Sequence, residues 1–404
     1  MSLWFILLLY VLGAQGQIAD IDRLQHDLSK FLSMPRYNSS QKSWTRMSIR
    51  HALDGVGLQT ISHTFIPDEG DELGVNLLSI QRGPHYDTSD DKVVVVSANY
   101  DTEENSPGVD DNGSGVAAVL ETARAMATLD RLYQRNNTII YAFFDMKHQF
   151  HVYLALRCLF FWLNRPQREH THSPINISIF FHALVGSHAF VEEVLLPYLS
   201  RSNASVVGVL VLDGVLNFDA FPATQSVPEG FEEIFPTAAR ELHEHNHMGD
   251  FIQLIGRVKK DDVIVQHFLA AFARSTGMNA GDWSFRPWLL LLRLPVQGIN
   301  SVEDMYRMHP YLFADHSSFF FHSNQNMDLP TIYISDTCEK LNRRGVRQYC
   351  PHCDSLYMLT DQNLRFLTII VDTVIRTVIQ LSDSGANMIV DELYFYQNAN
   401  DIST

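Results

Sequence analysis

Carboxylates are concentrated in residues 97–124, which read SANYDTEENSPGVDDNGSGVAAVLETAR and begin directly after four consecutive valines. Asp101 lies at the start of this polar stretch, and Asp110 and Asp111 stand side by side in a glycine-rich turn. Such a pair, framed by residues that let the backbone turn tightly, is typical of a metal-binding loop. Asn99 stands where a strong ligand is expected, and its neutral amide oxygen is a weaker zinc donor than an imidazole nitrogen.

Further aspartates fall where strands are expected to end. Asp145, Asp213 and Asp315 lie at or just after apolar runs or in nearby loops. A single Asp at such a place is more often a cap or turn residue, but several after consecutive strands favour a shared site. Hydrolytic sites with two zinc ions need His and carboxylate ligands, and a Glu that accepts the proton of the metal-bound water. The sequence therefore predicts a metal site assembled from strand ends.

The elements that would position these residues alternate between strand and helix. The runs KVVVVSANY, NTIIYAFFD, SVVGVLVLDGV and LPTIYISD are short and rich in apolar residues, as in strands buried on both faces. Helical periodicity follows in GVAAVLETARAMATL, in GSHAFVEEVLLPYL and in the closing DQNLRFLTIIVDTVIRTVIQL. We therefore expect an α/β fold of three layers, α/β/α, with a mixed, largely parallel sheet and the site at the carboxyl ends of its strands.

Outside this alternating core, two helices are expected over residues 18–32 and 43–58, and two strands over residues 58–66 and 74–83. A further helix is expected over residues 257–276. The apolar WSFRPWLLLLRLP is expected in the core.

The start of the chain and its sequons indicate a secreted glycoprotein. Residues 1–16 combine an apolar stretch with small residues before a cleavage point after Gly16, which predicts a signal peptide. The run is shorter than the roughly 20 residues needed to span a bilayer, so we expect no stable membrane span. The net charge of −16 argues against nucleic acid as a partner. Glycosylation is expected at Asn38, Asn136, Asn176 and Asn203, but not at the sequon of Asn112 inside the polar loop.

Residues 150–183 interrupt a strand-to-helix connection, where a loop of a few residues is usual. One interpretation is a surface insertion with its own short helix. The other, which we favour, is a retained intron, because Phe-Phe-His-Ala can be encoded by a pyrimidine tract that runs into a splice acceptor. Amplifying the transcript across this segment decides between them. Residues 386–404 are expected to form a polar C-terminal tail.

Residues 97–124 resemble the patterns His-x-Asp, Gly-Ala-Asp-Asp-Asn-x-Ser-Gly and Leu-Glu-x-Ala-Arg of the co-catalytic zinc aminopeptidases, metallopeptidase family twenty-eight. Glutaminyl cyclases and the glutamate carboxypeptidase type belong to the same broader group. The likeness continues through NLLSIQRG, FFD, LVGSHAFVEEVLLPYL, VLVLDGV, ADHSSFF and CDSLYMLTDQNL. It implies one zinc-exopeptidase-like domain over residues 17–385, two zinc ions, and the N-terminus of a peptide or protein as substrate.

Three site positions match the family. The resemblance implies that Asp110 bridges the two metals and is joined to Asp111 by a cis peptide bond. It implies that Asp101 orients a ligand and that Asp213 binds one metal.

Four site positions depart from the family. The first His ligand is Asn99, and the adjacent Glu-Glu pair, general base and then ligand, is Lys147 and His148. A Lys ammonium cannot accept a proton from water and repels a dication, whereas His148 can still coordinate zinc. The last His ligand falls on Cys350, whose thiolate can also bind zinc.

Several roles near the end of the chain stay open. A disulfide from Cys338 to Cys350 or Cys353 competes with metal binding by Cys350, and His352 is an alternative ligand. Asp315 and His316 resemble a family segment beside the substrate pocket, with a cap or packing role as the alternative.

The departures imply a secreted, aminopeptidase-like protein whose site is impaired, with one zinc ion or none. An active metallo-exopeptidase is one alternative. A glutaminyl-cyclase-like lyase is the other, and it needs only one zinc but loses the same ligand at Lys147 or His148.

Overall fold

A computed structural model describes residues 17–67, 72–148, 185–277, 285–295, 302–336 and 354–383. Several predictions fall outside these residues and are not tested by the structure. They are the signal peptide 1–16, the segment 150–183, the tail 386–404, the sequon at Asn176, and the roles of Cys338, Cys350, His352 and Cys353.

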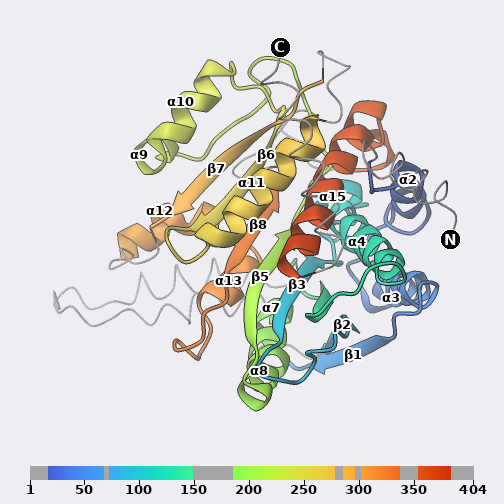
Figure 1. Cartoon of the computed structure of the whole chain (residues 1–404). Helices are drawn as coiled ribbons and strands as arrows, with labels where there is room; N and C mark the ends of the chain where they lie inside the picture. The colour runs from blue at the N-terminus through green and yellow to red at the C-terminus, as the bar shows by residue number, and fades with distance from the viewer. Residues whose placement is uncertain are drawn as a thin grey trace, which may run out of the picture.

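Within the described residues, eight strands form one mixed sheet in the order β1-β2-β4-β3-β5-β8-β6-β7 (Figure 1). Their bounds are Thr60–Phe65 (β1), Gly74–Gln81 (β2), Lys92–Asn99 (β3), Ile139–Phe144 (β4), Ser205–Leu212 (β5), Phe251–Arg257 (β6), Trp288–Leu294 (β7) and Thr331–Ser335 (β8). Strands β4, β3, β5 and β8 pair in parallel. Antiparallel pairs join β1 to β2, β2 to β4 and β6 to β8, and β7 pairs in parallel with β6.

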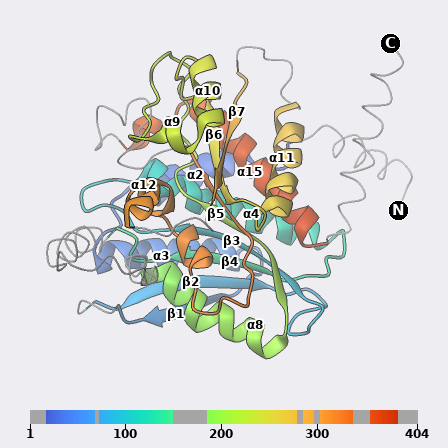
Figure 2. The same cartoon turned by 90° about the vertical axis from the view of Figure 1, so that its left-hand side faces the viewer.

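Helices cover both faces of the sheet (Figures 1 and 2). One face packs against α2 (Ile21–Lys30), α3 (Ser39–Asp54), α4 (Gly115–Leu129), α11 (Asp262–Gly277) and α15 (Asp361–Leu381). The other packs against η2 (Phe190–Leu195), α8 (Leu196–Ser202), α9 (Phe231–Ile234), α10 (Pro236–Glu244), α12 (Val302–Leu312) and α13 (His316–Phe320). Three further short elements lie in the described part of the chain: η1 (Val109–Ser114), α7 (Val185–Ala189) and η5 (Leu356–Met358).

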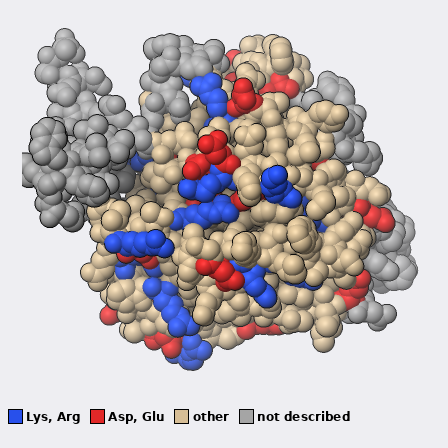
Figure 3. All heavy atoms as spheres, turned by 90° about the vertical axis from the view of Figure 1, so that its right-hand side faces the viewer, with Lys and Arg blue, Asp and Glu red and all other residues tan. Residues whose placement is uncertain are grey.

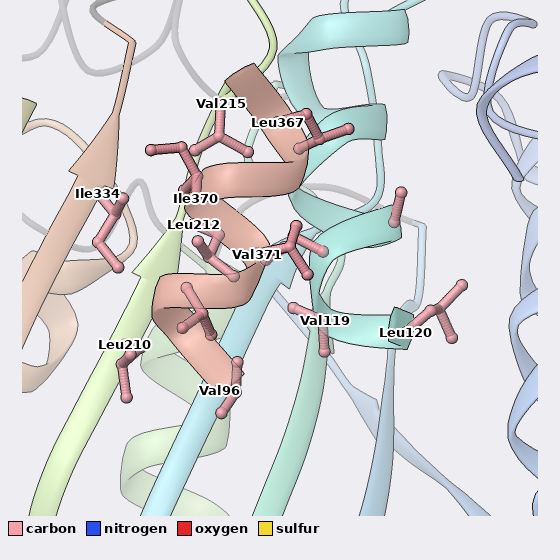
Figure 4. Close-up of a cluster of buried hydrophobic side chains, with 14 of the residues drawn as sticks. Val96, Val119, Leu120, Leu210, Leu212, Val215, Ile334, Leu367, Ile370 and Val371 are labelled. Atoms are coloured by element: carbon pink, nitrogen blue, oxygen red, sulfur yellow. The ribbon is translucent and has the colours of Figure 1, made fainter. Parts of the chain in front are cut away.

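The central strands β3, β4, β5 and β8 are buried on both sides, because successive side chains point to opposite faces and helices cover both faces. In β3, Val94 and Val96 join one apolar cluster, whereas Val93 and Val95 join the other. Figure 4 shows the first cluster, in which strand residues meet α15 and α4. Its labelled members include Val96, Leu210, Leu212, Ile334, Leu367, Ile370, Val371 and Val119. The three-layer α/β/α fold predicted from the sequence is confirmed.

One expectation needs correction at the far side of the sheet. The helix expected over residues 257–276 begins only at Asp262, because residues up to Arg257 form strand β6. Arg257 pairs with Asp261 at the junction, and the Asp261 carboxylate also accepts the Arg257 backbone N–H. The apolar run near residue 290 forms the edge strand β7, and its Leu290, Leu292 and Leu294 are buried in the core as expected.

The surface over α2 and α4 carries charges of both signs. On the face that Figure 3 shows, Lys and Arg stand beside Asp and Glu. Arg23 pairs with Glu121 and Asp20, and Arg124 pairs with Asp27. Among the helices that the structure describes, none is long and apolar enough to cross a membrane.

Candidate functional site

Neighbouring parallel strands bring the predicted site residues to one edge of the sheet. Asn99 ends β3, and Asp101 follows two residues later. Lys147 and His148 follow β4, and Asp213 follows β5 directly. Because β4, β3 and β5 are adjacent and parallel, their carboxyl ends meet at this edge.

Asn99 is fully buried, and both ends of its amide make hydrogen bonds within the protein. Its Nδ2 donates to the carbonyl and the Oδ1 of Asp101 at 3.1 and 3.2 Å. Its Oδ1 accepts from Asn112 Nδ2 at 2.8 Å. The one atom of Asn99 able to bind a metal is therefore engaged by another side chain. The second carboxylate oxygen of Asp101, Oδ2, accepts the backbone N–H of His148 at 2.8 Å.

Asp110 is held in the turn that opens η1. Its Oδ1 accepts the backbone N–H of Leu216 at 3.1 Å and the Ser114 hydroxyl at 3.3 Å. The Asp354 carboxylate accepts the N–H groups of Asp110 and Asp111 at 2.6 and 2.9 Å. Asp354 thereby anchors the aspartate pair from a distant part of the chain.

The position of the cis peptide bond differs from the one that the resemblance implied. The structure places it between Asp111 and Asn112, not between Asp110 and Asp111. Asn112 is buried beyond this bond, and its Nδ2 also donates to the Leu212 carbonyl at 2.8 Å.

Lys147 and Asp213 form the central charged contact of the site. Both side chains are buried, and the Lys147 ammonium donates a short hydrogen bond to Asp213 Oδ2. The Tyr333 hydroxyl donates to the same oxygen at 3.0 Å. The position that carries the general base in the family therefore carries a cation, bonded to a predicted metal ligand.

His148 lies beside the aspartate pair, with its Nε2 at 3.6 Å from Asp111 Oδ1. Burial alone would lower the pKa of His148. The interaction with Asp111 and the charge of Asp101 outweigh burial, so the pKa of His148 lies above its usual value.

Asp315 and His316 lie next to these residues and differ in role. Burial, with the charges of Asp213 and Asp101, raises the pKa of Asp315 to about 7, although Lys147 and a hydrogen bond from Ser187 act against the rise. Burial lowers the pKa of His316 to about 3. The neutral His316 ring donates from Nε2 to the Tyr311 carbonyl at 3.0 Å and lies 4.6 Å from the Tyr333 ring. These contacts favour a packing role for His316, whereas Asp315 faces the charged site.

Asp145 lies at a strand end as expected, but the fold uses it elsewhere. Its carboxylate pairs with Lys42 at 2.7 Å and with Arg46 at 3.8 Å, and it accepts the Val75 N–H at 3.0 Å. It therefore ties α3 to the sheet.

Arg36 is a site residue that the sequence did not reveal. Its guanidinium is fully buried and donates to five backbone carbonyls, those of Leu32, Met34, Tyr100, Pro107 and Gly108, at 2.7–3.0 Å. Burial lowers its pKa to about 10, and the charges of Asp354, Asp101 and Asp111 limit the fall, so Arg36 stays charged at neutral pH. Arg36 thus fixes both ends of the loop between Asp101 and Asp110.

The donor atoms do not fit a two-zinc centre. Among the described residues, no group of three or more His, Cys, Asp or Glu side chains is placed to hold a metal ion. Asp213 binds Lys147, and the Asn99 oxygen binds Asn112. The possible ligand Cys350 lies outside the described residues.

The predicted glycosylation sites differ in their surroundings. Asn38 and Asn203 are exposed, and Asn38 also caps α3 through Oδ1. Asn136 is half-buried, and its Nδ2 donates to Asp383 at 2.7 Å. Asn112 is buried, which agrees with the expectation that it carries no glycan.

Comparisons with known proteins agree with the fold and the resemblance. Residues 81–267 match the sequence profile of Peptidase family M28. No curated protein sequence matches the chain.

Solved structures share its architecture at low identity. The glutaminyl cyclase of Porphyromonas gingivalis has a TM-score of 0.52 and 15% identity, over 90% of this chain and 99% of that chain. A Zn-dependent exopeptidase from Parabacteroides distasonis has a TM-score of 0.50 and 16% identity, over 90% and 98%. LapB from Legionella pneumophila has a TM-score of 0.53 and 13% identity, over 90% and 72%. The predicted resemblance to this group of zinc-dependent exopeptidases and cyclases is therefore confirmed, and at these identities the neighbours show the fold.

Proposed function

We propose, from the match of residues 81–267 to Peptidase family M28, that this chain is a secreted, aminopeptidase-like protein in which metal-dependent hydrolysis is impaired. Its remaining activity is to bind the N-terminus of a peptide or protein. The observation that carries this proposal is the buried ion pair of Lys147 and Asp213.

The pair removes two requirements of the family's chemistry at once. Lys147 stands where a carboxylate would take the proton from water, and such a general base contributes roughly 10²–10⁴-fold in rate. The same ammonium engages Asp213, so a metal would have to displace a buried cation from one of its two retained carboxylate ligands. Lys147→Glu would return the base and remove the cation from Asp213 in one change.

Binding of an amino terminus is supported by the charge of the site. The carboxylates of Asp101, Asp213 and Asp315 are buried near one another, with Lys147 among them. Glu104 is exposed on the loop that follows Asp101. An acidic region of this kind attracts the ammonium group of a peptide N-terminus.

An assay of hydrolysis and an assay of binding together test this proposal. Purified protein and the variant Asn99→His/Lys147→Glu/His148→Glu are compared on a panel of aminoacyl fluorogenic substrates, with and without a chelator. We expect no chelator-sensitive hydrolysis by the wild type. Chelator-sensitive turnover by the wild type would favour an active metallo-exopeptidase, and release of ammonia from N-terminal glutamine would favour the cyclase-like alternative.

Binding is measured with fluorescent peptides that carry a free or an acetylated N-terminus. We expect the free amine to bind more tightly, and Asp315→Asn to weaken only that form. Equal binding of both forms would exclude recognition of the N-terminus.

Secretion is tested in the same preparation. The proposal requires that the protein is found in the medium, that it lacks residues 1–16, and that a glycosidase lowers its mass.

A further inference from the structure

Three histidines lie close together where α10 ends, far along the chain from the site described above. Residues 243–247 read His-Glu-His-Asn-His, so His243 and His247 have the spacing of an HExxH motif. Helix α10 lies beside strand β7 at the upper left of Figure 1. Short motifs of this kind are common by chance, so the argument depends on how the structure places the two rings.

The two rings are brought together although the helix ends between them. Helix α10 stops at Glu244, and the N–H groups of Asn246 and His247 donate back to the carbonyls of His243 and Leu242 at 3.0 and 2.9 Å. The ring centroids of His243 and His247 are 6.0 Å apart, and their planes meet at 82°. Rotation of two side chains is enough to point one nitrogen of each ring at a shared ion.

The backbone of His247 is in the left-handed conformation. Its φ is 52°, directly after Asn246 with a φ of 54°. Asparagine often ends a helix in this left-handed region, and histidine also enters it more often than most other residues with a side chain. A neighbouring segment fixes both residues, since Ala223 N–H and Gln225 N–H donate to the carbonyls of Asn246 and His247 at 2.9 and 3.0 Å. These bonds hold the turn that places the His247 ring beside His243.

The third histidine is used differently. The His245 ring stacks on Trp288, with ring centroids 4.1 Å apart. His243 is exposed and His247 is half-buried, so these two rings can be reached from solvent. Glu241 and Glu244 lie in the same helical turn and add negative charge that favours a cation.

We propose that His243 and His247 form a two-histidine binding site for a divalent transition-metal ion that prefers imidazole ligands, such as Cu²⁺ or Zn²⁺. Water completes the coordination, because no third His, Cys, Asp or Glu of the described residues converges there. The site binds a metal without the third protein ligand that hydrolytic zinc sites have. It is independent of the function proposed above.

Calorimetric titration of the full chain with Cu²⁺ tests this site. We expect the wild type to bind one Cu²⁺ that is lost, or at least about tenfold weaker, in His243→Ala and in His247→Asn. Asparagine suits position 247 because it tolerates the left-handed backbone and removes only the imidazole. His51→Ala, an exposed histidine on α3, is the matched control and should leave the titration unchanged.

A second readout separates this proposal from a purely structural role for His243. A histidine in the last turn of a helix also stabilises the helix dipole. We expect Cu²⁺ to raise the melting temperature of the wild type and of His51→Ala, but not of His247→Asn. If His243→Ala and His247→Asn bind Cu²⁺ as the wild type does, or if Cu²⁺ stabilises all four proteins equally, the proposal is wrong.

Discussion

The Lys147 ammonium and the Asp213 carboxylate are bonded to each other at the carboxyl ends of strands β4 and β5, out of contact with solvent. In the peptidases that this chain resembles, the matching positions carry a proton acceptor and a metal ligand. Here they neutralise each other. This one relationship sets the first two predictions.

Breaking the pair from either side should destabilise the fold. Lys147→Met leaves the Asp213 carboxylate as a buried charge without its partner. Asp213→Asn leaves the Lys147 ammonium in the same situation. Each change should therefore cost about 3–5 kcal/mol in the free energy of unfolding, measured by urea denaturation. The double variant should cost less than the sum of the two. Lys30→Met, at an exposed lysine of α2, should stay within about 0.5 kcal/mol. Additive costs would show that the two side chains do not interact.

Putting back the family's carboxylate should make stability depend on zinc. In a chelator, Lys147→Glu should melt below Lys147→Met, because a carboxylate joins Asp213 and Asp101 where a neutral chain does not. In the His247→Asn background, which lacks the proposed surface site, added zinc should raise the melting temperature of Lys147→Glu and leave His247→Asn itself unchanged. A Lys147→Glu protein as stable as Lys147→Met in the chelator would contradict the acidic environment described above.

Arg36 should be essential for the loop that carries the aspartates. Arg36→Met leaves five carbonyls without their donor, so we expect a loss of at least about 3 kcal/mol. Arg36→Lys keeps the charge but has fewer donors, so its loss of stability should lie between those of the wild type and Arg36→Met. Hydrogen exchange over residues 100–108 should quicken more than exchange in β6. The control is Arg50→Met, at an exposed arginine of α3. It should change neither the free energy of unfolding nor the hydrogen exchange over residues 100–108. Equal effects of Arg36→Met and Arg50→Met would refute this role.

Asp315 should make stability depend on pH. Its pKa is about 7 in the fold against an ordinary 3.8, so its favourable contribution is full below 3.8 and is lost as pH rises through 7. Asp315→Asn, which is always neutral, should therefore gain stability over the wild type as pH rises from 4.5 to 7.5. The gain is limited to about 4 kcal/mol and is measured by urea denaturation. Asp22→Asn, at an exposed residue of α2, should show no such gain. Parallel pH profiles of wild type and Asp315→Asn would contradict the raised pKa.

The central part of the fold could be predicted because its sequence signals are strong. The valine run of β3 predicts a buried strand, and the long periodic stretch of α15 predicts an amphipathic helix. Strand β6 was missed because FIQLIGR has a polar Gln and a Gly inside it and lacks a β-branched run. Tertiary pairing with β8 and β7 decides its conformation.

The site was predictable only where motif residues act locally. Asp101, Asp110 and Asp213 were candidates because each follows a strand or opens a helix, whereas only the family resemblance pointed to Lys147 and His148. The partners of these residues were not visible, since Arg36, Tyr333 and Asp354 reach the site from distant parts of the chain. Nothing in the sequence shows that Lys147 turns toward Asp213 rather than toward solvent.

The central claim is that this scaffold does not hold the two zinc ions of its relatives. Elemental analysis of protein purified in the presence of zinc and then freed of loose metal tests it most directly. The His247→Asn variant is measured alongside the wild type, so that an ion at the surface histidines is not counted. We predict far less than one zinc per chain in His247→Asn, and an increase when Asn99→His, Lys147→Glu and His148→Glu are added. Two zinc ions per chain in His247→Asn alone would contradict the account.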